Sequence, residues 1–252
     1  MIRILVLVVA FATLFLGAAV MSAGPGYRLG AWGLGEAFTI LRTAGPWLAY
    51  GGIASVIALM VGLVTRQRGV LMVCLLAIAV SGGLTFLLTQ QRANGAAHPI
   101  HDLTTDFTDP PAIVAAADLE RSNPAVYAGE APYGDTGKSV IRWQQELYPD
   151  IVPQTFKATP EEVFAAATQT LQAMKMEILT SDQQSGRLEA THTSAWFGFI
   201  DDFIVRIRPL PNGDVRVDVR SKSRIGRSDL GANATRIATF QKKLDDRLNP
   251  AR

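Results

Sequence analysis

The stretch FIDDFIVRIRPLPNGDVRVDVRSKS, residues 199–223, decides the fold of the C-terminal part of this chain. It contains two runs in which apolar and charged residues alternate, and the pair Asn212-Gly213 lies between them. Alternation with a period of two is typical of a strand with one buried face, and Asn-Gly is a strong signal for a tight hairpin. The stretch therefore predicts two antiparallel strands, with the valines of the second run on one face and charged residues on the other.

The segments around this hairpin complete a domain over residues 159–252. TPEEVFAAATQTLQAM, residues 159–174, begins with Thr, Pro and Glu in the positions of a capping box and continues with an apolar stripe at helical spacing. Short strands are expected at 176–181 and 186–194, and an amphipathic helix at 228–248. The order helix, strands, helix predicts an α+β fold, an antiparallel sheet of about four strands with helices packed on one face.

Uncharged apolar stretches occupy the N-terminal part of the chain at 4–20, 46–64 and 70–89. Each is about as long as the ~20 residues that a helix needs to cross a hydrocarbon core of ~30 Å. We therefore predict three N-terminal transmembrane helices in a membrane domain over residues 1–92, in a multi-pass protein of a bacterial inner membrane. The first stretch, with a basic start at Arg3, also fits a cleavable signal peptide; a retained span is favoured because two further spans follow.

The positions of Lys and Arg around these spans predict the topology. Arg3 and the free amine precede the first span, and Arg66 and Arg68 lie in the short loop between the second and the third. Positively charged flanks tend to stay in the cytoplasm. Residues 93–252 are therefore expected on the extracytoplasmic side, in the periplasm if the host is a Gram-negative bacterium.

The charge balance differs between the two parts of the chain. Residues 1–92 contain six Lys or Arg and one Asp or Glu, a net charge of +5, whereas residues 93–252 contain eighteen and twenty-one, a net charge of −3. The basic excess lies beside the spans, so it indicates topology and not a surface for nucleic acid. The expected partners are the lipid bilayer and an anionic lipid or another envelope protein. The only cysteine, Cys74, lies in the third span, so the soluble part has no thiol nucleophile.

Residues 93–158 are rich in Pro, Asp and Thr, and we expect them to form an extended arm that packs on the domain that follows. Their aromatic and aliphatic residues are too many for a free linker. Pro110 and Pro111 fit the first turn of a helix, so one helix is expected in the arm, around Ile113–Arg121.

Metal and cofactor sites are not expected. The histidines are His98 and His101 in HPIHD, followed by Asp102, and His192 in a predicted strand. The proline between the first two prevents a regular helical presentation, and the spacing matches no closed zinc pattern. The chain also lacks a Gly-x-Ser-x-Gly nucleophile motif and a Gly-x4-Gly-Lys-Ser/Thr phosphate loop.

The segment VDVRSKSRIGRSDLGANATRI, residues 217–237, contains the main candidate site. It joins the end of a strand to the start of a helix, where exposed N–H groups favour anions. We predict that its cationic and polar side chains contact an anion or an anionic group of a partner. The candidates are Arg220, Lys222, Arg224, Arg227, Ser228, Asp229 and Asn233. The alternative is that nearby aspartates neutralise the arginines and that the cluster only holds the turn together.

Asp201, Asp202 and Asp218 are the main acids of this alternative, and we assign them to structural ion pairs. Asp201 and Asp202 are adjacent, so their side chains point to opposite faces of a strand and cannot form a paired-carboxylate site without a bulge. At most one of them is expected on the charged face, paired with an arginine such as Arg206 or Arg220.

Three runs of the sequence are distinctive: HPIHDLTTDFTDPPA at 98–112, DDFIVRIRP at 201–209 and VDVRSKSRIGRSDLGANATRI at 217–237. Together they resemble the domain-of-unknown-function family numbered 1499. GPGYRLGAW with the three spans is similar to the membrane-bound members of that family, and the resemblance covers nearly the whole chain. The family has no established activity, so the resemblance implies no catalytic residue.

Two functions of different classes remain open. The favoured one is a membrane-anchored extracytoplasmic binding or scaffolding module of unknown ligand, with the basic turn at 220–229 as its contact. The alternative is an envelope hydrolase that uses Asp201 or Asp202 with His101 or Asp102, brought near by the arm. The enzyme is the less favoured of the two, because no residues of the chain meet the geometric roles of a catalytic site.

Overall fold

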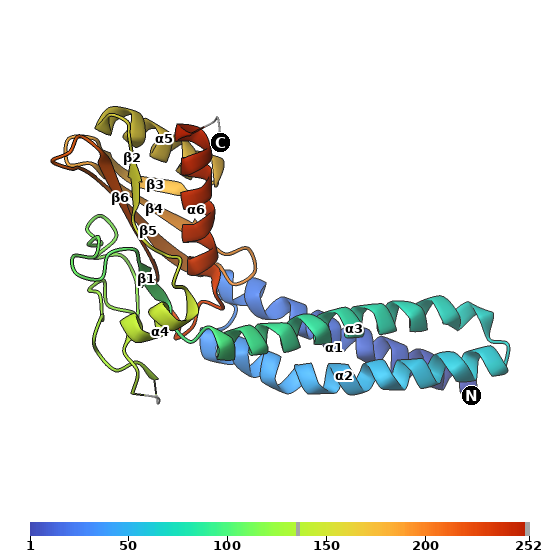
Figure 1. Ribbon diagram of the computed structural model, residues 1–252. Coiled ribbons are helices and arrows are strands. Elements are labelled where there is room, and N and C mark those ends of the chain that lie inside the picture. The colour runs from blue at the N-terminus through green and yellow to red at the C-terminus, as the bar shows by residue number, and fades with distance from the viewer. Residues whose placement is uncertain (135–136, 250–252) are drawn as a thin grey trace. The chain divides into compact units, whose positions relative to one another are not determined.

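The computed structural model describes residues 1–134 and 137–249 of the chain (Figure 1). The chain divides into two compact units, each with its own hydrophobic core. The helical unit comprises Met1–Ala93 and Ala195–Gly198, and the soluble unit comprises Asn94–Ser194 and Phe199–Arg252.

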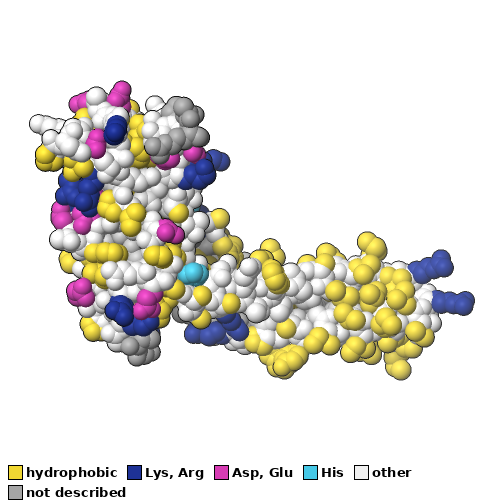
Figure 2. Space-filling model, in the orientation of Figure 1, with side chains coloured by type: hydrophobic (Ala, Val, Ile, Leu, Met, Phe, Trp, Pro, Cys, Tyr) yellow, Lys and Arg dark blue, Asp and Glu magenta, His cyan; other side chains and the backbone are white. Residues whose placement is uncertain are grey.

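Three long helices make up most of the helical unit: α1 (Ile2–Arg28), α2 (Leu34–Val64) and α3 (Arg68–Ala97), whose last four residues belong to the soluble unit. All three are long and apolar enough to cross a membrane, as the sequence predicts. Figure 2 shows hydrophobic side chains spread over the outer surface of these helices, where lipid would contact them. Each helix is longer than the predicted span and includes residues that flank the apolar stretch.

Small and hydroxyl-bearing residues let α1 and α2 pack closely. The Thr13 hydroxyl donates to the Gly51 carbonyl at 3.0 Å, and the Ser55 hydroxyl donates to Thr13 Oγ1 at 3.1 Å. A Cβ atom at Gly51 would lie 2.8 Å from Thr13 Oγ1, so this approach of the two backbones requires glycine.

A tryptophan packs into a glycine position of α1 within the helical unit. The indole N–H of Trp196, in the segment Ala195–Gly198, donates to the Met21 carbonyl at 3.2 Å. A Cβ atom at Gly24 would lie 2.6 Å from the Trp196 carbonyl oxygen. Gly24 therefore cannot be replaced by a larger residue without moving Trp196.

One antiparallel sheet of six strands organises the soluble unit (Figure 1). The strand order is β1-β6-β5-β4-β3, and β2 also pairs with β6. The strands are β1 (Asp102–Thr104), β2 (Gln154–Phe156), β3 (Glu177–Asp182), β4 (Arg187–Thr193), β5 (Ile200–Pro209) and β6 (Val215–Ser223). The α+β class is confirmed, but the predicted number of strands was too low. The two additional strands, β1 and β2, have three residues each, too few for an alternating pattern to be visible in the sequence.

The predicted hairpin is formed by β5 and β6. Gly213 in its turn has a φ of +88°, which favours glycine. In the register that results, Val205 lies opposite Val219 and Arg206 lies opposite Asp218. The apolar and charged residues of the two strands are therefore segregated to opposite faces.

Helices α5 (Pro160–Ala173) and α6 (Ala232–Leu248) pack on the apolar face, as predicted (Figure 1). The predicted capping box of α5 is present: Thr159 Oγ1 accepts the N–H of Glu162, and the Glu162 carboxylate accepts the N–H of Thr159 at 2.8 Å. Fully buried apolar side chains from both helices and from the sheet, including Phe203, fill the space between them.

The opposite face of the sheet contacts residues 105–126, which we call the arm loop. Ile113 and Ala116 of this loop pack on Ile204 of β5 in a small second core. The predicted helix around Ile113–Arg121 was wrong, because this part of the arm loop forms turns. Arginine side chains compete with the helical backbone for its carbonyl groups there. Arg187 donates a hydrogen bond to the Ala112 carbonyl and Arg121 donates one to the Ala116 carbonyl, both of which a helix would use.

A helix that the sequence analysis did not predict lies further along the arm, α4 (Val140–Leu147). Ser139 caps it by accepting the N–H of Arg142 at 3.2 Å. The buried amide of Gln144 in α4 bonds both backbone groups of Thr104 in β1, at 3.0 and 2.7 Å. Helix α4 therefore supports the edge of the sheet.

Candidate functional site

The face of the sheet under the arm loop has many charged side chains, and we call it the charged face. It follows from the alternation along the strands, since every second residue of β5 and β6 points away from α5 and α6. Its charged residues are Asp102, Arg187, Glu189, Asp202, Arg206, Arg208, Arg216, Asp218, Arg220, Lys222 and Arg224.

Arg220 and Lys222, the first two candidates of the basic turn, are buried and share one carboxylate. Arg220 binds Asp102 with two parallel hydrogen bonds of 2.9 Å, and Lys222 Nζ lies 2.8 Å from Asp102 Oδ2. Arg220 is 1% exposed and Lys222 is 3% exposed. The arm loop adds neutral acceptors, since the carbonyls of Ala125 and Val126 receive hydrogen bonds from these two cations.

Arg224, the third candidate, shares Asp202 with a residue of the arm loop. Arg224 Nη2 lies 2.7 Å from Asp202 Oδ1, and Arg121 Nη2 lies 2.5 Å from Asp202 Oδ2. Asp202 therefore faces the charged face and pairs with arginine, although neither partner is Arg206 or Arg220.

Asp201 points to the other face of β5 and pairs with a residue of α6. Arg236 Nη2 lies 2.9 Å from Asp201 Oδ2 and 3.2 Å from His192 Nδ1. Burial lowers the pKa of His192, and the charge of Arg236 lowers it further. The opposite directions of Asp201 and Asp202 agree with their adjacency in a strand, so the two carboxylates do not form a pair.

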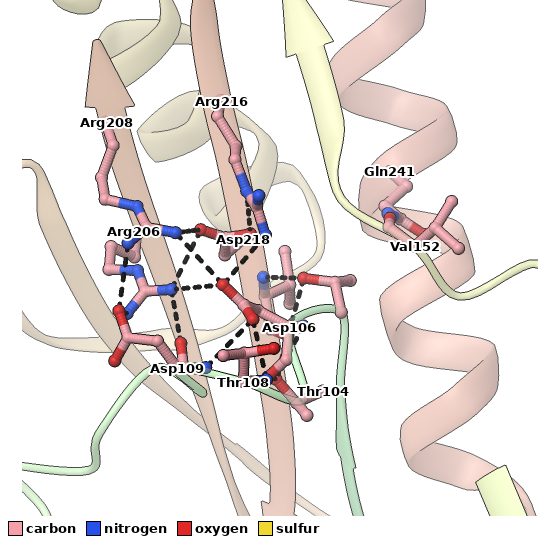
Figure 3. A network of polar contacts seen from close by, with 12 residues as sticks. Thr104, Asp106, Thr108, Asp109, Val152, Arg206, Arg208, Arg216, Asp218 and Gln241 are labelled. Atoms are coloured by element: carbon pink, nitrogen blue, oxygen red, sulfur yellow. Dashed lines mark hydrogen bonds and ion pairs between the residues drawn. The ribbon is translucent and has the colours of Figure 1, made fainter. Parts of the chain in front are cut away.

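Asp218 lies at the centre of a second polar network on the charged face, which we call the arginine clamp (Figure 3). It joins three arginines of the sheet to Asp218 and to two aspartates of the arm loop: Arg206, Arg208, Arg216, Asp106 and Asp109. Asp218 Oδ2 lies 2.8 Å from Arg208 Nη2, and Asp109 Oδ2 lies 2.9 Å from Arg206 Nη1. The clamp fixes one end of the arm loop to β5 and β6.

The clamp shifts the titration of its members. Burial acts to raise the pKa of Asp106, but the backbone N–H groups of Asp109 and Thr108 and the charges of Arg216 and Arg206 together hold that pKa below its ordinary value. The hydrogen bond to Asp218 raises the pKa of Arg216, against the effect of its burial. Both shifts favour the ionised forms that make the clamp.

The polar candidates at the end of the turn cap α6 and brace the chain before it. The Asp229 carboxylate accepts the N–H groups of Gly231 and Asn233, each at 2.8 Å. Burial raises the pKa of Asp229, while these two N–H groups oppose the rise. The Ser228 hydroxyl donates to the His98 carbonyl at 2.6 Å. The N–H groups that were expected to attract an anion are therefore occupied by a side chain of the protein.

Asn233 is fully buried and joins α6 to β6. Its amide nitrogen donates to the His101 carbonyl at 3.1 Å and to Ser223 Oγ at 3.0 Å, and its amide oxygen accepts the Ser221 hydroxyl at 2.6 Å. All the polar atoms of this side chain are used within the fold, so its role here is structural.

Arg227, the remaining candidate, differs from the others because its side chain is exposed. Its carbonyl accepts the Tyr133 hydroxyl, and the carbonyl of the neighbouring Gly226 accepts the Asn123 amide at 2.8 Å. The Arg227 guanidinium makes no ion pair with residues of the described ranges. A braced backbone therefore presents one cation that no described acid neutralises.

The histidines of HPIHD contact tyrosines of the arm. His101 Nδ1 lies 2.5 Å from the Tyr133 hydroxyl, and His98 Nδ1 lies 2.6 Å from the Tyr148 hydroxyl. Burial lowers the pKa of His101 and raises the pKa of Tyr133 to about 12. Since the single hydrogen of the Tyr133 hydroxyl goes to the Arg227 carbonyl, neutral His101 donates from Nδ1 to Tyr133. Among the described residues, no group of three His, Cys, Asp or Glu is arranged to hold a metal ion.

Three of the candidates, Arg220, Lys222 and Arg224, thus lie together as buried side chains on the charged face. Arg227 differs from them because its side chain is exposed. The structure also adds residues that the sequence analysis did not select, above all Arg121. Arg236 had a weak signal, because it lies one helical turn after Asn233 and faces the same side. No signal in the sequence pointed to Arg121, because its partner Asp202 is far away in the sequence and only the fold brings the two together.

Comparisons with known proteins identify the family and a distant structural likeness. A family model described as "Protein of unknown function (DUF1499)" matches residues 102–244. No curated protein matches the chain. A solved structure, described as the crystal structure of TTHA0849 from Thermus thermophilus, is similar over 40% of this chain and 96% of that chain, with 12% sequence identity and a TM-score of 0.25.

Proposed function

Because this chain belongs to the DUF1499 family of proteins of unknown function, we propose that it is a membrane-anchored binding or scaffolding module that contacts an anionic group of a partner. The three apolar helices supply the anchor. The contact is made by the turn after β6, and the soluble unit lies outside the cytoplasm.

The observation that supports this proposal is the braced turn with its exposed Arg227. The Tyr133 hydroxyl and the Asn123 amide hold the carbonyls of Arg227 and Gly226, and Ser228 is tied to the His98 carbonyl. A cation on a rigid backbone loses little conformational entropy when it binds, which favours contact with a carboxylate or a phosphate group.

The hydrolase alternative has less support. Asp102, Asp201 and Asp202 are each buried, and each is bound by at least one arginine at 2.9 Å or less. Carboxylates that are buried and bound to arginine in this way do not face a substrate or a water molecule, whereas the groups of a hydrolytic site have to contact both.

The location is proposed from the distribution of Lys and Arg around the spans. A fusion of alkaline phosphatase after Arg252 tests it, together with a separate fusion of a fluorescent protein that matures only in the cytoplasm. We expect an active phosphatase and a dark fluorescent protein. An inactive phosphatase with bright fluorescence would place the soluble unit in the cytoplasm and contradict this part of the proposal.

Replacement of Arg227 tests the contact itself. The full chain in nanodiscs of neutral lipid is mixed at low salt with vesicles of phosphatidylcholine, with or without phosphatidylglycerol, and binding is measured by co-flotation. In parallel, a photoreactive amino acid at the neighbouring exposed position 230, which keeps Arg227 in place, reports contact with envelope proteins in cells. Arg227→Glu is expected to abolish whichever contact is found, and the charge-matched control Lys243→Glu, an exposed position of α6, is expected to preserve it.

The outcome separates the two kinds of partner. Loss of vesicle binding in Arg227→Glu alone identifies an anionic lipid surface, and loss of one specific crosslinked protein identifies a protein partner. If Arg227→Glu and Lys243→Glu behave alike in both measurements, the turn is not the contact.

A further inference from the structure

The strongest unexplained feature of the molecule is an excess of buried positive charge. Four cations share two carboxylates on the charged face, which leaves a net charge of +2 (four positive minus two negative). We call these four residues the cation cluster: Arg121, Arg220, Lys222 and Arg224.

The cluster is contiguous across neighbouring strands. In the sheet, Lys222 of β6 lies opposite Asp102 of β1 on one side and opposite Asp202 of β5 on the other. Burial lowers the pKa of Lys222, and the charges of Arg220 and Arg121 lower it further against the effect of Asp102. The cations of the two ion-pair groups therefore act on one another.

Water has little access to this excess charge. Arg220, Lys222 and Arg224 are 1%, 3% and 6% exposed, and the Arg121 side chain is 9% exposed. Charges taken out of water are destabilising unless they are paired with opposite charge and fully hydrogen-bonded. Two of the four cations lack such a counter-charge.

Arg121 also has donors without acceptors. Its Nη2 binds Asp202 and the Ala116 carbonyl, whereas its Nε and Nη1 are buried without any hydrogen-bond partner in the described structure. The hydroxyl of Tyr127, whose ring lies under the Arg220 guanidinium, is likewise buried without a partner among the described residues. Native proteins leave few such groups unsatisfied, so each one calls for an acceptor.

We propose that the cation cluster binds a small dianionic oxyanion, phosphate or sulfate, which accepts hydrogen bonds from Arg121. An oxyanion supplies both missing elements at once, because it carries negative charge and has several acceptor oxygens. A charge of −2 balances the excess of +2. The arm loop closes over the cluster through the carbonyls of Pro111, Ala125 and Val126, so the site takes a free ion and excludes a phosphate with a bulky substituent.

This inference goes beyond the proposed contact at Arg227 and does not depend on it. The ion binds under the arm loop and stabilises its closed position, whereas Arg227 is exposed. Each proposal is therefore tested by its own substitution: Arg227→Glu is expected to leave the oxyanion site unchanged.

The test is the thermal stability of the full chain in uncharged detergent after exhaustive dialysis against a phosphate- and sulfate-free buffer. Phosphate and sulfate are expected to raise the unfolding midpoint by several degrees at millimolar concentration, because a ligand that binds only the folded state stabilises it. Chloride at the same ionic strength is expected to raise it much less. Equal effects of all three salts would overturn the proposal, since they would show only general screening.

Two variants place the ion at the cluster. Arg121→Met keeps an unbranched apolar stem, removes the guanidinium with its unpaired donors and is expected to lose the response to phosphate. Lys222→Met removes one excess charge, and its midpoint without phosphate is expected to equal or exceed that of the native chain, with a weakened phosphate response. Arg216→Met in the charge-balanced clamp is the control and is expected to keep the full response. A full response in Arg121→Met or in Lys222→Met would place the ion elsewhere.

A second measurement covers the case in which a variant does not fold. Phosphate and sulfate released on denaturation of the native chain, purified without dialysis, are measured by ion chromatography. About one oxyanion per chain is expected if the site is filled in the cell and the ion exchanges slowly. Less than a tenth of that amount, together with no selective response in the thermal measurement, contradicts the proposal.

Discussion

The cation cluster and the arginine clamp lie on the same face of the sheet and are built from the same residue types, but their charge balance differs. The clamp joins three arginines to three aspartates and is neutral. The cluster joins four cations to two aspartates. Water reaches the clamp, where the Asp109 side chain is 66% exposed, whereas the cluster is closed off.

The difference separates a structural role from a binding role. A neutral network that water reaches needs no further counter-charge, although Arg206 Nε is buried without a partner among the described residues, and its function is to hold the arm loop on the sheet. A buried network with excess charge is complete only when it acquires an anion. The following predictions test this distinction, from the largest expected effect to the smallest.

Asp102→Ala is expected to have the largest effect, because it leaves Arg220 and Lys222 buried without a counter-charge. Breaking a buried pair by removing one partner destabilises by about 3–5 kcal/mol. Thermal unfolding of the full chain in detergent measures the loss. If the variant is as stable as the native chain, the cluster is more hydrated than its burial indicates.

Asp218→Asn removes the central acid of the clamp and is expected to cost less. Its three arginines are partly exposed and regain water when the carboxylate is lost, so the loss is limited to about 2 kcal/mol, as for hydrogen bonds to a charged group. Hydrogen exchange is expected to increase at residues 105–109 and to stay unchanged in α5. An effect as large as that of Asp102→Ala would show that the clamp is no more hydrated than the cluster.

Mild acid is expected to destabilise the fold through His101 at a higher pH than the one at which the clamp titrates. Burial holds the pKa of His101 below its ordinary value of 6.5. The unfolded chain therefore binds a proton that the folded chain does not, and stability falls as the pH drops below about 6.5 towards the folded pKa. Measurement of the unfolding midpoint between pH 7 and pH 5 should show this slope.

His101→Asn is the control for this slope, since the Asn amide can replace the Nδ1–H donor to Tyr133 without titrating. The slope is expected to shrink to the part contributed by His192 and, with the opposite sign, by Asp229, whose pKa burial raises. The clamp responds at lower pH, because the lowered pKa of Asp106 keeps its contribution intact until the pH falls below 3.8. A slope that is the same in the native chain and in His101→Asn would exclude His101 as its source.

Asp109→Ala is expected to have the smallest effect, at most about 1 kcal/mol, because exposed ion pairs contribute little to stability. The small effect should vanish at high salt, since screening acts on exposed charges and not on buried ones. Thermal unfolding at low and high salt, with Asp102→Ala as the comparison, measures both parts of this prediction.

The fold of the soluble unit was predictable where the local pattern was long. The hairpin of β5 and β6 follows from alternating residues around Asn212-Gly213, and α5 follows from its capping box and apolar stripe. The strands β1 and β2 were not predictable, because three residues are too few to show a period. The turns of the arm loop were mistaken for a helix, because one of the arginines that bind its carbonyls, Arg187, comes from a distant part of the sequence.

The sequence by itself determined the class of the fold, the three apolar helices and the charged character of one face of β6, because each depends on residues that are close together in the chain. It also determined that Asp201 and Asp202 point in opposite directions, since adjacent strand residues do so. Only the tertiary structure decided which acid meets which cation. Asp102, Arg121 and Arg220 come from distant segments of the chain. The net charge at a buried site depends on all the charged groups that the fold brings together there, and neither composition nor spacing in the sequence specifies that set.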